Sequence, residues 1–127
     1  MFYSPCLEII PMWEVKRTHY EKGGKFFSDG ATTFFNSRYA EHGYRIKGSP
    51  NIYFITSEKK RLLLDEHTRG MIPHDRREYT VRCMDERTGI VVNASELGEY
   101  LSRSGAVRRM ERILADEIAL AKEMSTL

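Results

Sequence analysis

The chain has 127 residues, of which 41% are hydrophobic, and its 20 basic and 18 acidic side chains give a formal net charge of +2. This length suits a single domain with one core, and no apolar run approaches the roughly 20 residues that span a bilayer. The balanced charge excludes a protein whose whole surface is drawn to nucleic acid. The first residues lack the basic and apolar stretches of an export signal, so we expect a cytoplasmic protein.

The beginning of the chain predicts a short leading segment followed by a strand. Residues 1–11 are interpreted as an N-terminal segment, and residues 12–127 as a single domain. At the start of this domain, residues 12–20 carry large side chains at alternate positions, Trp13 and Val15, between a proline and a pair of glycines. This alternation predicts a strand.

The middle of the chain predicts a buried strand and a long connection. The segment 32–46 fits neither the helical nor the strand period cleanly, so a short helix and a strand both stay open. Residues 51–56 are β-branched and aromatic throughout, which predicts a buried strand. The connection over residues 57–77 exceeds the usual loop length, so it either holds a short helix or has a function of its own.

The last third of the chain predicts a hairpin and a helix. Residues 78–94 alternate apolar and polar side chains around a turn at 86–89, which predicts a β-hairpin, and residues 93–101 are extended or form one helical turn. After residues 102–105, apolar residues recur every three to four positions and predict an amphipathic helix of about four turns or more. The predicted fold class is therefore α+β, a small antiparallel β-sheet of three to five strands packed against a C-terminal amphipathic α-helix.

Several short blocks resemble a family of small bacteriophage and prophage proteins with no assigned activity known to us. The blocks are Phe-Phe-Asn-Ser-Arg at 34–38, Tyr-Phe-Ile-Thr-Ser-Glu at 53–58, Tyr-Thr-Val-Arg at 79–82 with Asp85 and Thr88-Gly89, and Gly-Glu-Tyr-Leu-Ser-Arg at 98–103. The resemblance spans about two-thirds of the chain, whose two ends and 57–77 connection are longer than usual. It implies a viral or mobile-element origin, and hence a place in the host cytoplasm. The hairpin and helix are also similar in layout to arm-type DNA-binding domains of tyrosine integrases, an analogy of fold alone.

The sequence contains no motif of a known catalytic site. It has no phosphate-binding glycine loop, no HExxH pair and no GxSxG turn, so we predict a non-enzymatic protein without cofactor or metal. The cluster of Asp65-Glu66-His67 with His74-Asp75 is interpreted as a solvated charged loop. Cys6 and Cys83 lack zinc or disulfide spacing and are interpreted as reduced thiols, Cys83 being an inert strand residue. An enzyme would have to use the scattered residues Tyr53, His67, His74 and Asp75.

Arginines crowd the start of the last helix, and acidic residues lie further along it. The helix dipole favours the reverse order by about 0.3 to 1 kcal/mol for each exposed charge. A partner with negative charge would explain the pattern, and pairing inside the domain, of Arg112 with Asp116 or of the other arginines with Glu96 and Glu99, would explain it equally well. A second basic set brackets the long connection. The predicted partner-binding residues are Arg103, Arg108, Arg109, Arg112, Lys59, Lys60, Arg61, Arg76 and Arg77.

Three functions are compatible with these patterns. The first is a phage or mobile-element accessory protein that binds a host macromolecule, such as an inhibitor of a host defence or nucleic-acid-handling complex. The second is a DNA- or RNA-binding domain that uses the sheet face and the region 103–112, with bases stacked on Tyr39, Tyr44 and Tyr53. The third is an enzyme. No membrane partner is expected, and the oligomeric state stays open.

Overall fold

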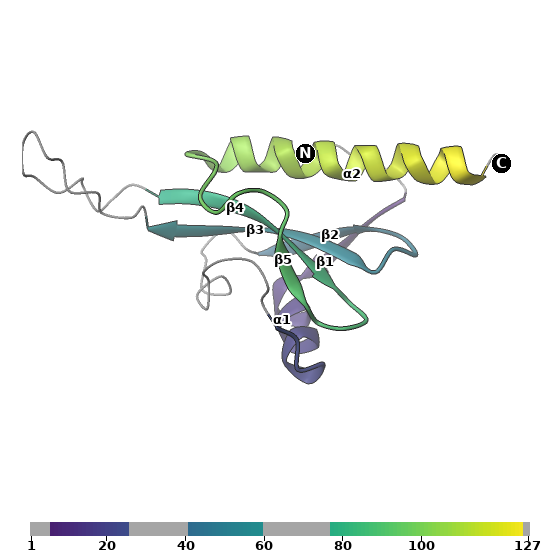
Figure 1. The fold of residues 1–127 in the computed structure, drawn as a ribbon, viewed down its shortest axis with the longest axis horizontal. Helices are drawn as coiled ribbons and strands as arrows, with labels where there is room; N and C mark the ends of the chain where they lie inside the picture. The colour runs from purple at the N-terminus through teal and green to yellow at the C-terminus, as the bar shows by residue number, and fades with distance from the viewer. Residues whose placement is uncertain (1–5, 26–40, 60–76, 126–127) are drawn as a thin grey trace, which may run out of the picture.

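The computed structural model describes residues 6–25, 41–59 and 77–125, which form a five-stranded antiparallel sheet with two helices (Figure 1). The strands lie in the order in which they follow one another along the chain, so each pairs with its sequence neighbours. This confirms the predicted α+β class. The elements are β1 (Leu7–Pro11), α1 (Met12–Glu21), β2 (His42–Ile46), β3 (Asn51–Lys59), β4 (Arg77–Asp85), β5 (Val91–Asn93) and α2 (Arg103–Ser125).

The prediction of a strand over residues 12–20 is wrong, because these residues form α1. Pro11 occupies the N-cap position with φ −65° and ψ 144°. It ends β1 without removing a helical hydrogen bond, since the first backbone N–H groups of a helix have no partner inside it. The buried residues of α1 are Met12, Val15 and His19, a helical spacing that competes with the apparent alternation of Trp13 and Val15.

The other predicted elements agree with the structure over the residues it describes. The strand over 51–56 is confirmed within β3, the hairpin over 78–94 is confirmed as β4 and β5, and the final helix is confirmed as α2. Within the open segment 32–46, residues 42–46 form β2, whereas residues 32–40 and the stretch 60–76 of the long connection lie outside the described residues. Residues 7–11, set apart as an N-terminal segment, form the edge strand β1.

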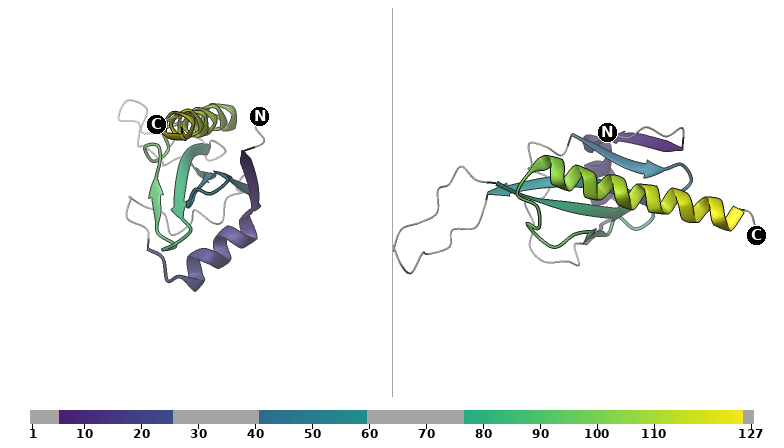
Figure 2. Two further views of the ribbon diagram at one scale, coloured as in Figure 1. Left: turned by 90° about the vertical axis from the view of Figure 1, so that its right-hand side faces the viewer. Right: turned by 90° about the horizontal axis from the view of Figure 1, so that it is seen from above.

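The two helices cover opposite faces of the sheet, and each face has its own core (Figure 2). Successive strand residues point to opposite faces, so neighbouring residues of β3 contribute to different cores. The core on the α1 side contains Ile10, Met12, Val15, Ile52, Phe54, Met84 and Val91. The core on the α2 side contains Ile46, Tyr53, Ile55, Tyr79, Val81, Ala106, Met110 and Leu114.

Close backbone approaches hold α1 in place. A Cβ on Gly43 would lie 2.7 Å from Cγ2 of Ile52 and 3.3 Å from Cγ2 of Val15, so glycine lets the helix approach β2. At the other end of α1, Nδ1 of His19 lies 2.7 Å from the Gly89 carbonyl oxygen, which can only accept. This hydrogen bond ties α1 to the turn between β4 and β5. Neither helix of the described residues combines the length and apolar character needed to cross a membrane.

Candidate functional site

Tyr53 and Cys83 lie together beneath α2, where Tyr53 is buried and Cys83 is half-buried. The Tyr53 hydroxyl donates a hydrogen bond of 2.6 Å to Oε1 of Glu117, and burial raises the pKa of this tyrosine. Burial also raises the pKa of the Cys83 thiol to about 12. Tyr53, predicted to stack on a base, is only 7% exposed, so stacking would require α2 to move away. A thiol with this pKa is almost fully protonated at neutral pH, which makes Cys83 a poor nucleophile.

A buried arginine links three strands on the other face of the sheet. The side chain of Arg82 is fully buried, and its Nε donates to Oγ1 of Thr56 at 3.0 Å. Its Nη1 donates to Oδ1 of Asn93. These bonds connect β4 with both of its neighbours, β3 and β5, so we interpret Arg82 as a structural residue.

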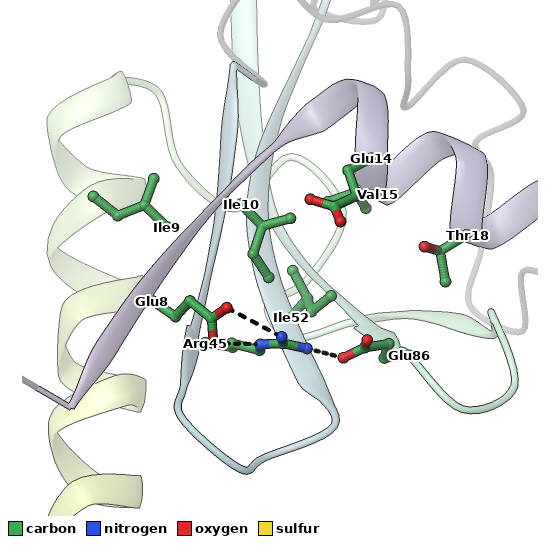
Figure 3. A pocket seen from close by; sticks show the side chains of 9 residues that line it. All are labelled: Glu8, Ile9, Ile10, Glu14, Val15, Thr18, Arg45, Ile52 and Glu86. Atoms are coloured by element: carbon green, nitrogen blue, oxygen red, sulfur yellow. Dashed lines mark hydrogen bonds and ion pairs between the residues drawn. The ribbon is translucent and has the colours of Figure 1, made fainter.

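Arg45 forms a second polar cluster beside a pocket of about 80 Å³ between β1 and α1 (Figure 3). Its guanidinium donates to both carboxylate oxygens of Glu8, at 3.1 and 3.2 Å, and forms an ion pair with Glu86. The hydrogen bonds from Arg45 lower the pKa of Glu8. The cluster joins β1, β2 and the turn after β4. Its charged groups are already paired with one another. Within residues 6–25, 41–59 and 77–125, no group of three or more His, Cys, Asp or Glu side chains is placed to hold a metal.

The predicted arginines at the start of α2 do not form one cluster. Arg103 lies on the β2 side, where it lines a small pocket with His42 and Tyr44. Burial raises the pKa of Tyr44, and the charge of Arg103 opposes that shift. Arg109 and Arg112 lie instead near Tyr100, whose pKa is raised by burial and lowered by both arginines. Tyr44 itself is half-buried.

Arg108, Arg109 and Arg112 are exposed on α2. In the described part of the chain, none of the three forms a salt bridge, and the alternative of pairing with Asp116, Glu96 or Glu99 is therefore not observed. The pKa of Glu99 is lowered mainly by a hydrogen bond from Tyr100, and Arg109 contributes less. These three guanidinium groups face solvent.

The second basic set is only partly described. Arg77 is half-buried, and its guanidinium donates to the carbonyl oxygen of Ser57 at 2.7 Å and to the Ser57 hydroxyl, which ties β4 to β3. Lys59 lies opposite Arg77 in the register of these strands. The remaining predicted site residues lie outside the described residues: Tyr39, Lys60, Arg61, Arg76, Asp65, Glu66, His67, His74 and Asp75.

The outer face of α1 carries a stripe of large side chains that was not predicted from the sequence and that we call the aromatic stripe: Trp13, Arg17 and Tyr20. Trp13 is 62% exposed and Tyr20 is 70% exposed. The guanidinium carbon of Arg17 lies 5.2 Å from the centre of the Trp13 ring, a cation–π contact. The spacing i, i+4, i+7 would have revealed the stripe, but only once residues 12–21 are assigned as a helix.

Two carboxylates flank the aromatic stripe. Arg17 lies 3.8 Å from Glu14 and 3.9 Å from Glu21, at the limit of salt-bridge distance. All three side chains are largely exposed, so these pairs contribute little to stability. They do reduce the net positive charge of this face.

Comparison with known proteins places the chain in a family. No curated protein and no solved structure matches the chain. A family of unknown function matches residues 11–111, which include α1, strands β2 to β5 and the first turns of α2. The chain therefore belongs to this family, DUF7447.

Proposed function

We propose that this protein is a non-enzymatic binding protein that contacts a partner protein through the aromatic stripe of α1. The observation that carries the proposal is the exposure of Trp13 and Tyr20 on one helical face with Arg17 between them. Trp, Tyr and Arg are the residue types most enriched at the energetic centres of protein interfaces. Side chains spaced i, i+4 and i+7 are also the anchors by which a helix binds in an apolar groove.

The charges around the stripe favour a protein over a nucleic acid. Glu14 and Glu21 lie beside Arg17 and would repel a phosphate backbone. A protein groove with an apolar floor and a carboxylate opposite Arg17 would bury both rings and pair the guanidinium. The contact with Trp13 already orients Arg17, which lowers the entropy lost on binding.

The resemblance to small phage and prophage proteins supports a host protein as the partner. We propose that the chain acts as an accessory protein on a host defence or nucleic-acid-handling complex, and that it inhibits this complex by occupying a surface. The helices on both sheet faces argue against the alternative of nucleic-acid binding on the open sheet. That alternative would then depend on the arginines of α2.

The test is affinity capture from host lysate with purified wild-type protein and with the double variant Trp13→Ala/Tyr20→Ala, each with and without nuclease. We expect one host protein in stoichiometric amount, unaffected by nuclease and lost in the double variant. Ile9→Ala is the matched control, because Ile9 is 59% exposed but lies outside the stripe, on β1. Capture that disappears with nuclease, or that survives the double variant, would overturn the proposal.

A further inference from the structure

The two halves of α2 carry opposite charge. Its first half, residues 103–112, contains four arginines and one glutamate, whereas residues 113–125 contain three acidic side chains and one lysine. The positive half lies at the helix N-terminus, where the helix dipole disfavours cations. Within the described residues, Arg108, Arg109 and Arg112 lack the salt bridges that would compensate.

Exposed apolar side chains lie at both ends of the same helix. Leu101, two residues before α2, is 69% exposed. Leu120 and Met124, in the last two turns, are 57% and 64% exposed. Single exposed apolar side chains are common on protein surfaces and need no explanation. These three, however, lie at the two ends of one charged helix.

The last turns of α2 extend past the edge of the sheet. Seen from above, the C-terminal end of the helix continues beyond the strands (Figure 2). Leu114 is the last fully buried residue, and every side chain from Ala119 to Met124 is exposed. A groove of about 420 Å³ lies between these turns and the β2–β3 turn, lined by Ile46, Leu120 and Met124 among others. Two helical turns without packing are marginal in water, so a covering surface would stabilise them.

We propose that two copies of the chain associate through antiparallel packing of their α2 helices about a two-fold axis. Such a contact uses the same surface on both copies, so the surface must complement itself. In α2 it does, because antiparallel packing sets the basic half of each helix against the acidic half of the other. The exposed Leu120 and Met124 near the end of each helix then lie against the first half of the other helix.

One position of the axis pairs opposite charges on the two helices. An axis near Asp116 sets Arg109 of each helix opposite Glu123 of the other copy, because both lie seven residues from position 116. Arg112 then lies about one turn from Asp116 of the second copy, within reach of a long side chain. A partner of uniform charge would match only one half of α2, which favours a second copy. The contact lies on the opposite face of the sheet from the aromatic stripe, so it does not depend on the proposed function.

The test is the mass of the protein in solution, measured by sedimentation equilibrium over a range of concentrations. We expect the wild type to form a dimer that weakens as salt rises, because the contact includes exposed charges. Arg109→Glu/Arg112→Glu leaves both halves of α2 acidic, and Asp116→Arg/Glu123→Arg leaves both basic. Each variant alone should bind itself at least about tenfold more weakly, and an equimolar mixture of the two should form a heterodimer.

Lys22→Glu is the control, since Lys22 is an exposed cation after α1 and should leave the dimer unchanged. Circular dichroism and thermal unfolding confirm that each variant is folded. A wild type that stays monomeric at high micromolar concentration would overturn the proposal. A dimer that both charge variants preserve, or a mixture that forms no heterodimer, would overturn it as well.

Discussion

α1 and α2 cover opposite faces of one sheet, but the sheet holds them by different means. α1 has ten residues, of which Met12, Val15 and His19 are buried, and polar contacts fix it at both ends: Met12 N–H donates to Glu41, and His19 donates to Gly89. α2 has 23 residues and is held mainly by an apolar stripe of Ala106, Met110 and Leu114 along its first half, with one hydrogen bond from Tyr53 to Glu117.

The difference determines which surface each helix exposes. A short helix fixed at its ends can have large aromatic residues on its outer face, because these residues are not needed for packing. A long helix held by one stripe extends beyond its support, and its free end and its charges face solvent. Each helix therefore presents a different candidate surface, the aromatic stripe of α1 and the charged face of α2.

The largest expected loss of stability comes from truncating a residue in the core on the α1 side. Phe54 is fully buried there, so Phe54→Ala should lower the free energy of unfolding by about 3 to 5 kcal/mol. Urea unfolding followed by circular dichroism measures the loss. Ile9→Ala, at an exposed position, should change stability by less than about 0.5 kcal/mol. Equal losses in the two variants would mean that Phe54 does not anchor this face.

The matching change on the α2 side is Leu114→Ala. Leu114 is 1% exposed beneath α2, and its truncation should lower the free energy of unfolding by about 2 to 5 kcal/mol. The same urea titration reports it. If α2 were only loosely attached, the loss would fall below this range and the helical signal would decrease before the sheet unfolds.

A smaller effect is expected at the close approach between α1 and β2. In Gly43→Ala the new methyl group would lie 2.7 Å from Cγ2 of Ile52, so the helix and the strand must separate. We expect a loss of about 1 to 3 kcal/mol in the free energy of unfolding. Gly48→Ala cannot serve as a control, because Gly48 has a φ of +88° and a side chain there would strain the backbone. Ala119→Gly cannot serve either, because it would test only the exposed end of α2. An unchanged unfolding midpoint in Gly43→Ala would show that α1 packs less tightly than the structure indicates.

The smallest effect should come from the polar contact beneath α2. Tyr53→Phe removes the hydrogen bond to Glu117 and should lower the free energy of unfolding by about 1 kcal/mol. Burial raises the pKa of Tyr53 above its ordinary value of 10.0. The stability that the protonated Tyr53 contributes is therefore complete below pH 10 and is lost as the pH rises above 10. The free energy of unfolding should therefore change less between pH 8 and pH 10.5 in Tyr53→Phe than in the wild type. A wild type with equal stability at both pH values would contradict this expectation.

Periodicity alone was sufficient for the elements with one dominant pattern. The alternation in β4, the β-branched run in β3 and the apolar stripe of α2 each fit a single period. α1 failed this test, because Trp13 and Val15 imitate a strand while the true inner face, Met12, Val15 and His19, contains a histidine. Pro11 was interpreted only as the boundary of a strand, although proline is also favoured at the start of a helix.

The candidate sites depended on information that the sequence does not contain. The arginines on α2 were found because cations crowd the start of the helix, where the helix dipole disfavours them. The burial of Tyr53 was not predictable, because residues 52–55 are all apolar or aromatic and give no indication of which face α2 covers. The aromatic stripe required the correct assignment of α1 before its three residues could be placed on one face.

The placement of the helices on opposite sides of the sheet has a consequence for avidity. Two chains joined through α2 would each keep α1 on the side away from the contact, so the assembly would present two recognition helices. A target with two matching sites would then bind bivalently, and the second contact would form at an effective concentration on the order of millimolar. Weak individual contacts at Trp13 and Tyr20 could in this way give durable occupancy of a repetitive or dimeric target.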